Sequence, residues 1–135
     1  MRKIIDYSSD IGLYIKSKNI ESLIKEIIYG MFEYLVDKNK NLKSETKKTL
    51  SCLIEGNIED GIVDVLNFFL KTFYIEKLIP YRIYIKKTNS GGFSIKALMG
   101  EFQGNLKNYI KAATYCENKI TQNNNTLTFK VIFDV

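Results

Sequence analysis

The chain contains no histidine, and this absence narrows its chemistry more than any other feature of its composition. Nucleophilic catalysis by a Ser–His or Cys–His pair needs an imidazole base, so neither arrangement is available. Zinc sites with histidine ligands are excluded for the same reason. A bound metal ion would therefore be held by oxygen, with at most Cys52 or Cys116 adding sulfur.

Cysteine is scarce as well. Cys52 and Cys116 are far apart and form no Cys-x-x-Cys pair. Both occur within apolar, strand-like patterns, which predicts buried free thiols rather than a disulfide or a metal-binding pair.

Long apolar runs are also missing. No stretch is long enough to cross a membrane, and no signal peptide opens the chain. We therefore expect a soluble cytoplasmic protein with no membrane partner.

Internal repeats and linker-like segments are absent from the 135 residues, which predicts one domain spanning residues 1–135. The chain is 45% hydrophobic and 26% charged, a balance typical of globular proteins. Its net charge of +5 comes almost entirely from lysine, because Arg2 and Arg82 are the only arginines. This charge permits attraction to RNA or to an acidic protein surface.

Apolar periodicity predicts two helices. Asn19 is a good N-cap for a helix over residues 20–36, and Asn57 caps a second helix over residues 58–73. Strand-like alternation covers the remaining apolar segments: residues 3–7, 11–16, 50–54, 80–85, 93–99, 109–119 and 128–135. Residues 37–48 are predicted to be a solvated loop, and residues 100–107 a connection. Two helices packed with six or seven mostly antiparallel strands give an α+β domain.

The last predicted strand ends in acidic groups. Phe129, Val131 and Phe133 share one face, so the end of the chain reads as core, yet it finishes in Asp134 and the carboxylate of Val135. Asp10, at a bend between the first two strands, is the natural candidate to complete an acidic corner. Such oxygen ligands suit calcium, magnesium or manganese. Spacing alone does not show that the two ends meet, so an ordinary exposed aspartate at each strand end stays open as the alternative to a metal site.

Two other groups of polar side chains invite a functional interpretation. Lys111, flanked by Tyr109 and Tyr115 on one predicted strand face, is suited to a phosphate while the rings stack on bases. The alternative is an outward sheet face with a solvated lysine. Asp60, Asp64 and Asn67 lie on one face of the second helix, where a solvated face is favoured over a metal site.

Short motifs in a fixed order connect these features. Asp10-Ile11-Gly12 follows the first strand, and the first helix runs from its cap at Asn19 to Phe32. The later motifs are Gly56 with Ile62-Val63-Asp64-Val65-Leu66-Asn67, Ile79-Pro80, Gly100-Glu101-Phe102, Ile110-Lys111-Ala112-Ala113-Thr114-Tyr115 and Val131-Ile132-Phe133-Asp134-Val135. In this order and at these separations, the chain resembles the archease family from end to end.

Archeases are small accessory proteins of the RtcB-type tRNA-splicing ligase. The resemblance implies a non-enzymatic activator or chaperone, which helps that ligase become guanylylated on its own histidine with GTP and divalent metal. The ligase then turns over repeatedly in tRNA splicing and RNA repair, so tRNA or RNA is an indirect partner. The resemblance also implies a metal site made by Asp10, Asp134 and the main chain of Val135. Our own hypothesis adds a partner surface with Lys111, Glu101 and Tyr115.

The chain departs from the family pattern at two places. Tyr7-Ser8-Ser9 stands where many archeases have His-Thr-Ala, and Cys116 stands where a histidine is frequent. Contacts made by those histidines would here be either missing or replaced by contacts of hydroxyl and thiol groups. Two other functions stay open: a stand-alone RNA-binding module using the face of Tyr109, Lys111 and Tyr115, and a small hydrolase that uses carboxylate-bound metal.

Overall fold

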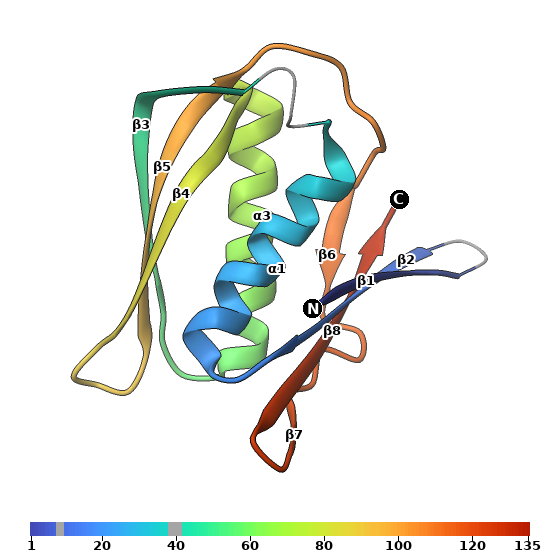
Figure 1. Cartoon of the computed structure of the whole chain (residues 1–135), viewed down its shortest axis with the longest axis vertical. Coiled ribbons are helices and arrows are strands. Elements are labelled where there is room, and N and C mark those ends of the chain that lie inside the picture. Colours follow the sequence, from blue (N-terminus) through green and yellow to red (C-terminus); the bar gives the residue numbers. More distant parts are fainter. Residues whose placement is uncertain (8–9, 38–41) are drawn as a thin grey trace.

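Two helices lie between two antiparallel β-sheets (Figure 1). This computed structural model describes residues 1–7, 10–37 and 42–135, and the side chains of all of these except 42–44. In chain order the described elements are β1 (Arg2–Asp6), β2 (Asp10–Ser17), α1 (Ile20–Leu35), β3 (Leu42–Ile54), α3 (Ile58–Glu76), β4 (Leu78–Lys87), β5 (Phe93–Phe102), β6 (Ala112–Thr114), β7 (Thr121–Asn123) and β8 (Thr126–Asp134).

The larger sheet has the strand order β1-β2-β8-β6, and β7 also pairs with β8. The smaller sheet has the order β3-β5-β4. Every pair of neighbouring strands among the described residues is antiparallel. The α+β class predicted from the sequence is confirmed, with the strands divided between two sheets.

Both helices begin where the sequence predicts. The side chain of Asn19 accepts a hydrogen bond from the backbone N–H of Ser22, and Asn57 accepts one from Asp60, each at 2.8 Å. These bonds satisfy backbone donors that the first turn of a helix leaves unpaired. The apolar faces of the helices meet around Phe32, whose ring packs edge-to-face against Phe69 and Phe73 at centroid distances of 6.3 and 6.0 Å.

The predicted strand over residues 109–119 is wrong for most of its length, because only Ala112–Thr114 pairs with β8. β6 and the residues just before it run along α3. Side chains of this helix bond their backbone in place of a neighbouring strand. The side-chain amide of Asn67 donates to the carbonyl of Ala113 and accepts from its N–H, at 3.0 and 2.8 Å. The hydroxyl of Tyr74 likewise donates to the carbonyl of Ile110 at 2.6 Å.

The solvated loop predicted for residues 37–48 is corrected in part. β3 begins at Leu42, so its first half is the polar, lysine-rich stretch; residues 38–41 lie outside the described residues. β3 is an edge strand of its sheet. Edge strands carry charged residues because these discourage pairing with other chains, which makes them resemble loops in composition. The predicted connection at 100–107 is also shorter, since β5 continues to Phe102.

Both cysteines are free thiols, as predicted, but their burial differs from the prediction. Cys52 lies in β3 of the smaller sheet and is half-buried. Burial raises the pKa of its thiol to about 11. Cys116 is exposed, because the chain leaves β6 at Thr114 and turns through Glu117, whose φ is 57°.

No helix in the described part of the chain is long and apolar enough to cross a membrane.

Replacing Asn67 by alanine should destabilise the fold. The change leaves the N–H and carbonyl of the buried Ala113 without their side-chain partner on α3. Losing a partner of a buried polar group costs about 1–3 kcal/mol of unfolding free energy, which urea denaturation measures. Lys71→Ala, at an exposed position one turn further along the same helix, is the matched control. Equal effects of the two substitutions would contradict this account of the 109–119 segment.

The two thiols should react at different rates in the native protein. Thiolate is the reactive form, so the raised pKa of Cys52 slows its alkylation at neutral pH, whereas Cys116 is exposed. Limited iodoacetamide treatment followed by peptide mass spectrometry should show Cys116 modified first. The two rates should converge in denaturant. Faster modification of Cys52 in the native protein would show that its burial is described incorrectly.

Candidate functional site

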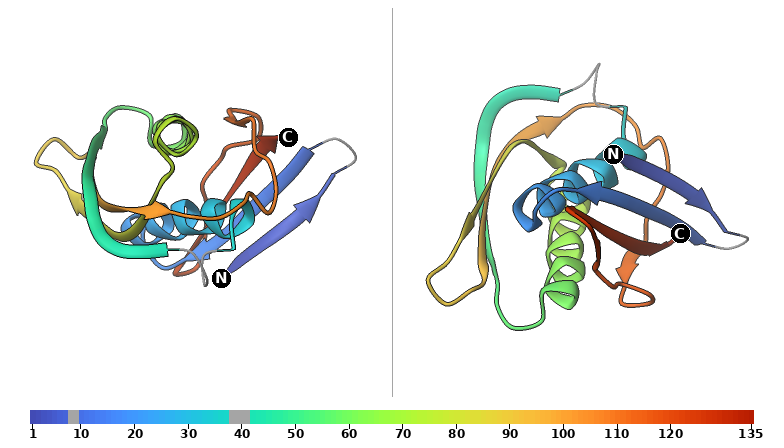
Figure 2. Two further views of the ribbon diagram at one scale, coloured as in Figure 1. Left: turned by 90° about the horizontal axis from the view of Figure 1, so that it is seen from above. Right: turned by 60° about the horizontal axis from the view of Figure 1, so that its bottom comes forward.

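The two ends of the chain meet in the larger sheet. Asp10 opens β2, Asp134 closes β8, and the two residues are direct partners across this antiparallel pair. Figure 2 shows the C terminus beside the β1–β2 hairpin. Directly opposed residues project from the same face of a sheet, with Cβ atoms about 4.5–5.5 Å apart. The predicted convergence of Asp10 and Asp134 is therefore confirmed, and we call these two residues with Val135 the acidic corner.

The acidic corner faces away from the helices. Phe133 and Ile11, the next pair in the register, are buried in the core, and side chains alternate between the two faces of a strand. Asp10 and Asp134 are therefore directed outward and are half-buried, and Val135 is 46% exposed. Burial of the apolar partners fixes the orientation of the carboxylates.

The backbone at the acidic corner is anchored on both sides. The N–H of Lys111 donates to the carbonyl of Asp134 at 2.7 Å, and the N–H of Tyr7 donates to the carbonyl of Asp10 at 2.9 Å. Lys111 thus lies beside the corner, and its side chain is exposed. Neither aspartate carboxylate has a hydrogen bond or ion pair with any residue that the structure describes. The main chain is held while the carboxylates stay available to a ligand.

The donor set of the acidic corner fits a hard cation. Like charges that face each other across a sheet destabilise it, and a bound cation would relieve that repulsion. Magnesium commonly binds one or two carboxylates and keeps several waters, so the side chains of Asp10 and Asp134 with the main chain of Val135 are sufficient ligands. No group of three or more Asp, Glu, Cys or His side chains suited to a metal ion occurs within residues 1–7, 10–37 and 42–135. Metal binding at the corner stays a prediction.

A second polar cluster, which the sequence did not reveal, lies on the same outer face. The ammonium of Lys130 is 3.3 Å from the hydroxyl of Tyr7 and 3.3 Å from a carboxylate oxygen of Glu117. These partners raise the pKa of Lys130, Tyr7 most strongly. Tyr7 packs on Gly12, where a β-carbon would come within 2.9 Å of its ring. Gly12 therefore provides the space for the ring that positions Lys130.

Known proteins match this chain over nearly its whole length. A model of the archease protein family matches residues 3–135. A protein archease from Thermoplasma acidophilum is 30% identical over 98% of this chain and 92% of its own length. The corresponding protein from Thermoplasma volcanium is 29% identical, with 98% of each chain covered.

The chain belongs to the archease family.

Solved structures agree with this assignment. Protein 1598 of Methanobacterium thermoautotrophicum superimposes with a TM-score of 0.80 over 99% of this chain and 98% of its own; at 17% identity, this likeness concerns the fold. An archease from Thermotoga maritima, described as a possible chaperone, is 27% identical with a TM-score of 0.70, and covers 100% of this chain and 98% of its own.

The archease motif around Lys111 is placed differently from the prediction. Tyr109, Lys111 and Tyr115 do not share a strand face, because β6 begins only at Ala112 and ends at Thr114. The ring of Tyr109 packs against that of Tyr74 at 5.7 Å, and the hydroxyl of Tyr115 donates to Asp64. The RNA-binding face proposed for these three residues therefore lacks its structural basis.

The acidic face of α3 is exposed, in agreement with the preferred interpretation, and its acids also bond the chain that follows β6. Asp64 accepts from Tyr115, Asp60 accepts from the side chain of Asn118 at 2.9 Å, and Glu59 accepts from the N–H of Ile120 at 2.8 Å. These acids hold the chain between β6 and β7. Their role in the structure is to fix the segment that leaves the acidic corner.

Glu101 does not join the corner. It lies in β5 of the smaller sheet, where its carboxylate accepts a hydrogen bond from Gln103 at 2.7 Å. Of the positions where this archease departs from the family pattern, Ser8 and Ser9 lie outside the described residues, Tyr7 carries the contacts to Lys130, and Cys116 is exposed.

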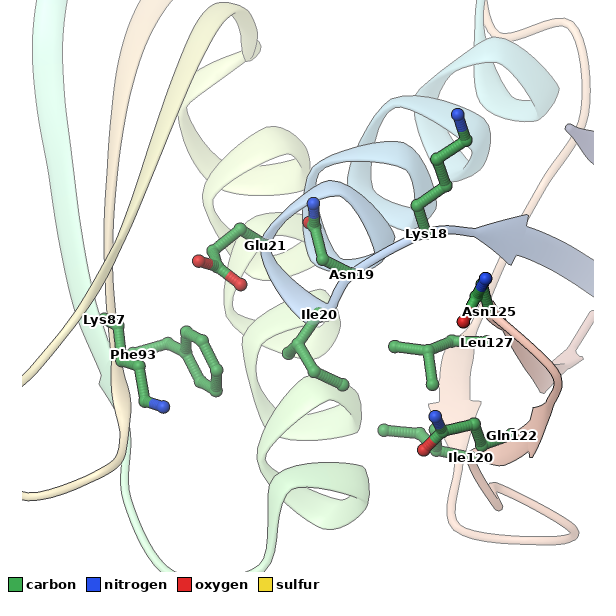
Figure 3. A pocket seen from close by; sticks show the side chains of 10 residues that line it. All are labelled: Lys18, Asn19, Ile20, Glu21, Lys87, Phe93, Ile120, Gln122, Asn125 and Leu127. Atoms are coloured by element: carbon green, nitrogen blue, oxygen red, sulfur yellow. The ribbon is translucent and has the colours of Figure 1, made fainter.

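A cavity of about 610 Å³ lies at the start of α1, where the ends of the two sheets separate (Figure 3). Ile20, Phe93 and Leu127 form its apolar walls, and Lys18 and Lys87 lie at its rim. None of the site residues predicted from the sequence lines this cavity.

The Tyr115–Asp64 contact should make stability pH-dependent in the alkaline range. The hydrogen bond to Asp64 raises the pKa of Tyr115 above its ordinary value of 10.0, because it favours the protonated phenol. The contribution of this hydrogen bond to the free energy of unfolding is complete below the pKa that Tyr115 has in the unfolded state. It is lost as the pH rises through the higher pKa of the folded state. Urea denaturation across this range should therefore show wild type losing stability relative to Tyr115→Phe. A difference between the two proteins that does not change with pH would contradict the contact.

Proposed function

We propose that this protein is a non-enzymatic activator of an RtcB-type tRNA-splicing RNA ligase, which promotes metal- and GTP-dependent guanylylation of that ligase and its repeated turnover. The observation that carries the proposal is the pairing of Asp10 with Asp134 across β2 and β8, beside the anchored backbone of Lys111. Membership of the archease family, and the description of the Thermotoga archease as a possible chaperone, are consistent with it.

The physical basis of activation is a shift in the conformations of the ligase. A ligase whose nucleotide pocket is competent only part of the time binds GTP with an affinity reduced by that fraction. A partner that binds the competent form more tightly raises its population, and needs no chemistry of its own. The acidic corner is suited to this role because its carboxylates point outward at the ends of β2 and β8, where a partner can reach them.

The residues of the acidic corner have distinct parts in this proposal. Asp10, Asp134 and the main chain of Val135 would hold a divalent ion, either calcium, magnesium or manganese. Such an ion supplies positive charge that offsets phosphate and carboxylate charge where the two proteins meet. Lys111, exposed next to Asp134, would contact phosphate or an acidic group of the ligase. Backbone hydrogen bonds anchor three of these residues, because the carbonyls of Asp10 and Asp134 and the N–H of Lys111 are all bonded.

The test measures ligase guanylylation with GTP and metal, with and without this protein. Wild type should accelerate the reaction, whereas Asp10→Asn, Asp134→Asn and Lys111→Ala should each lose most of the acceleration. Asp6→Asn is the matched control, because Asp6 is an exposed aspartate of the neighbouring β1 that pairs with Ile11 and not with Asp134. No acceleration by wild type, or full acceleration by the three variants, would overturn the proposal.

A metal titration of the protein alone separates the ion from the ligase. Without metal, Asp10→Asn should be as stable as wild type or more stable, by about 0.2–1 kcal/mol, since it removes the repulsion of opposed carboxylates. With magnesium or manganese the melting temperature of wild type should rise and that of Asp10→Asn should not. Metal-dependent hydrolysis of a phosphoester by the pure protein would favour the hydrolase alternative instead.

A further inference from the structure

The outer face of the smaller sheet is basic and carries no carboxylate in its central rows. Three cross-strand rows run over β3, β5 and β4, and their outward residues include Arg82, Tyr84, Lys86 and Lys96. The other five positions in these rows are serine, threonine or leucine. Intervening residues such as Ile83 and Ile95 are buried toward the helices, so the rows point to solvent. We call Arg82, Tyr84, Lys86 and Lys96 the basic sheet face.

The cations surround an exposed aromatic ring. Tyr84 is 48% exposed and is paired directly with Lys96 on β5. Arg82 and Lys86 lie two residues before and after it on β4, about 7 Å away along the strand, and all three cationic side chains are exposed. The ring is therefore flanked by positive charge along its strand and across the sheet.

These cations have no internal counter-ions. Arg82, Lys86 and Lys96 form no ion pair with any residue in the described ranges, whereas Lys48 pairs with Glu76 and Lys130 with Glu117. The nearest acids in these strands are Glu45 and Glu101, and Glu55 follows the end of β3; all three lie beyond the three rows. The charge of this face thus complements an anion that comes from outside the chain.

We propose that the basic sheet face binds single-stranded RNA. Cations arranged around an aromatic ring on a flat sheet match the way single strands are held, with phosphates on lysine and arginine and a base stacked on the ring. Serine and threonine hydroxyls in the same rows can bond to base edges and to the ribose 2′-hydroxyl. Charged residues are depleted at the centre of protein–protein interfaces, whereas three of the four residues of the basic sheet face are cations, which favours RNA over a protein partner.

This inference does not rest on the proposed ligase. The basic sheet face belongs to the sheet of β3, β4 and β5, whereas the acidic corner belongs to the other sheet, and the helices pack between the two (Figure 1). RNA on one sheet leaves the acidic corner on the other sheet accessible to a protein.

Fluorescence anisotropy of a short labelled oligouridylate, titrated with the full chain in the absence of ligase, tests the proposal. Three cation–phosphate contacts on a single strand give a slope of log affinity against log salt of about −2, at about −0.7 per contact. Lys96→Gln should weaken binding and reduce this slope by about 0.7. Tyr84→Ala should weaken binding by about 5- to 150-fold through lost stacking, and Tyr84→Phe should retain most of the affinity.

Lys16→Gln is the matched control, because Lys16 is an exposed strand lysine on the outer face of the other sheet. It removes the same charge and should leave the affinity near that of wild type. Circular dichroism melts of each variant verify that the fold is retained.

Three results would overturn the proposal: no saturable binding by wild type, equal losses from Lys16→Gln and Lys96→Gln, or unchanged affinity in Tyr84→Ala. If Lys96→Gln impaired ligase guanylylation while RNA affinity stayed the same, the face would dock a protein and the RNA assignment would be wrong. Loss of RNA binding with intact ligase activation would separate this inference from the proposed function.

Discussion

The pairing of β2 with β8 is the interaction on which the rest of this structure depends. β8 contributes Phe129, Val131 and Phe133 to the core, and it pairs with β2 on one edge and with β6 and β7 on the other. A shift of one residue in the register would turn each core residue of a strand outward, so apolar burial holds the register strongly. The same register places Asp10 opposite Asp134. Two like charges are thus held together by the core beneath them, and a cation that bound there would find both carboxylates already in position.

A second constraint is the use of α3 as a substitute for a strand. Asn67 and Tyr74 bond the backbone of Ala113 and Ile110, and the acids at the start of the helix bond the chain that follows. This arrangement lets the segment with Lys111 run beside the acidic corner although little of it lies in a sheet. The helix that completes the core therefore also positions the surface proposed to meet the ligase.

Much of the fold could be predicted because its signals are local. Asn19 and Asn57 mark helix starts through their own side chains, and the alternation of Phe129, Val131 and Phe133 specifies a buried strand face. The alternation over 109–119 wrongly predicts one long strand, because the backbone partners of this segment include side chains of α3, which no alternation pattern encodes. The contact of Tyr7 with Lys130 joins the two ends of the chain, so only the strand register reveals it. Asp10 and Asp134 also come from the two ends of the chain. The family resemblance predicts that they meet, whereas their spacing in the sequence does not.

The central claim is that Asp10 and Asp134 share a divalent cation, and paramagnetic NMR tests it most directly. Substoichiometric manganese added to the labelled protein should selectively broaden the amide signals of residues at the acidic corner, such as Ile11, Ala112 and Phe133. The amide of Lys96, in the other sheet, should be unaffected. Uniform broadening, or selective broadening at another acidic group such as Glu59 and Asp60, would contradict the account.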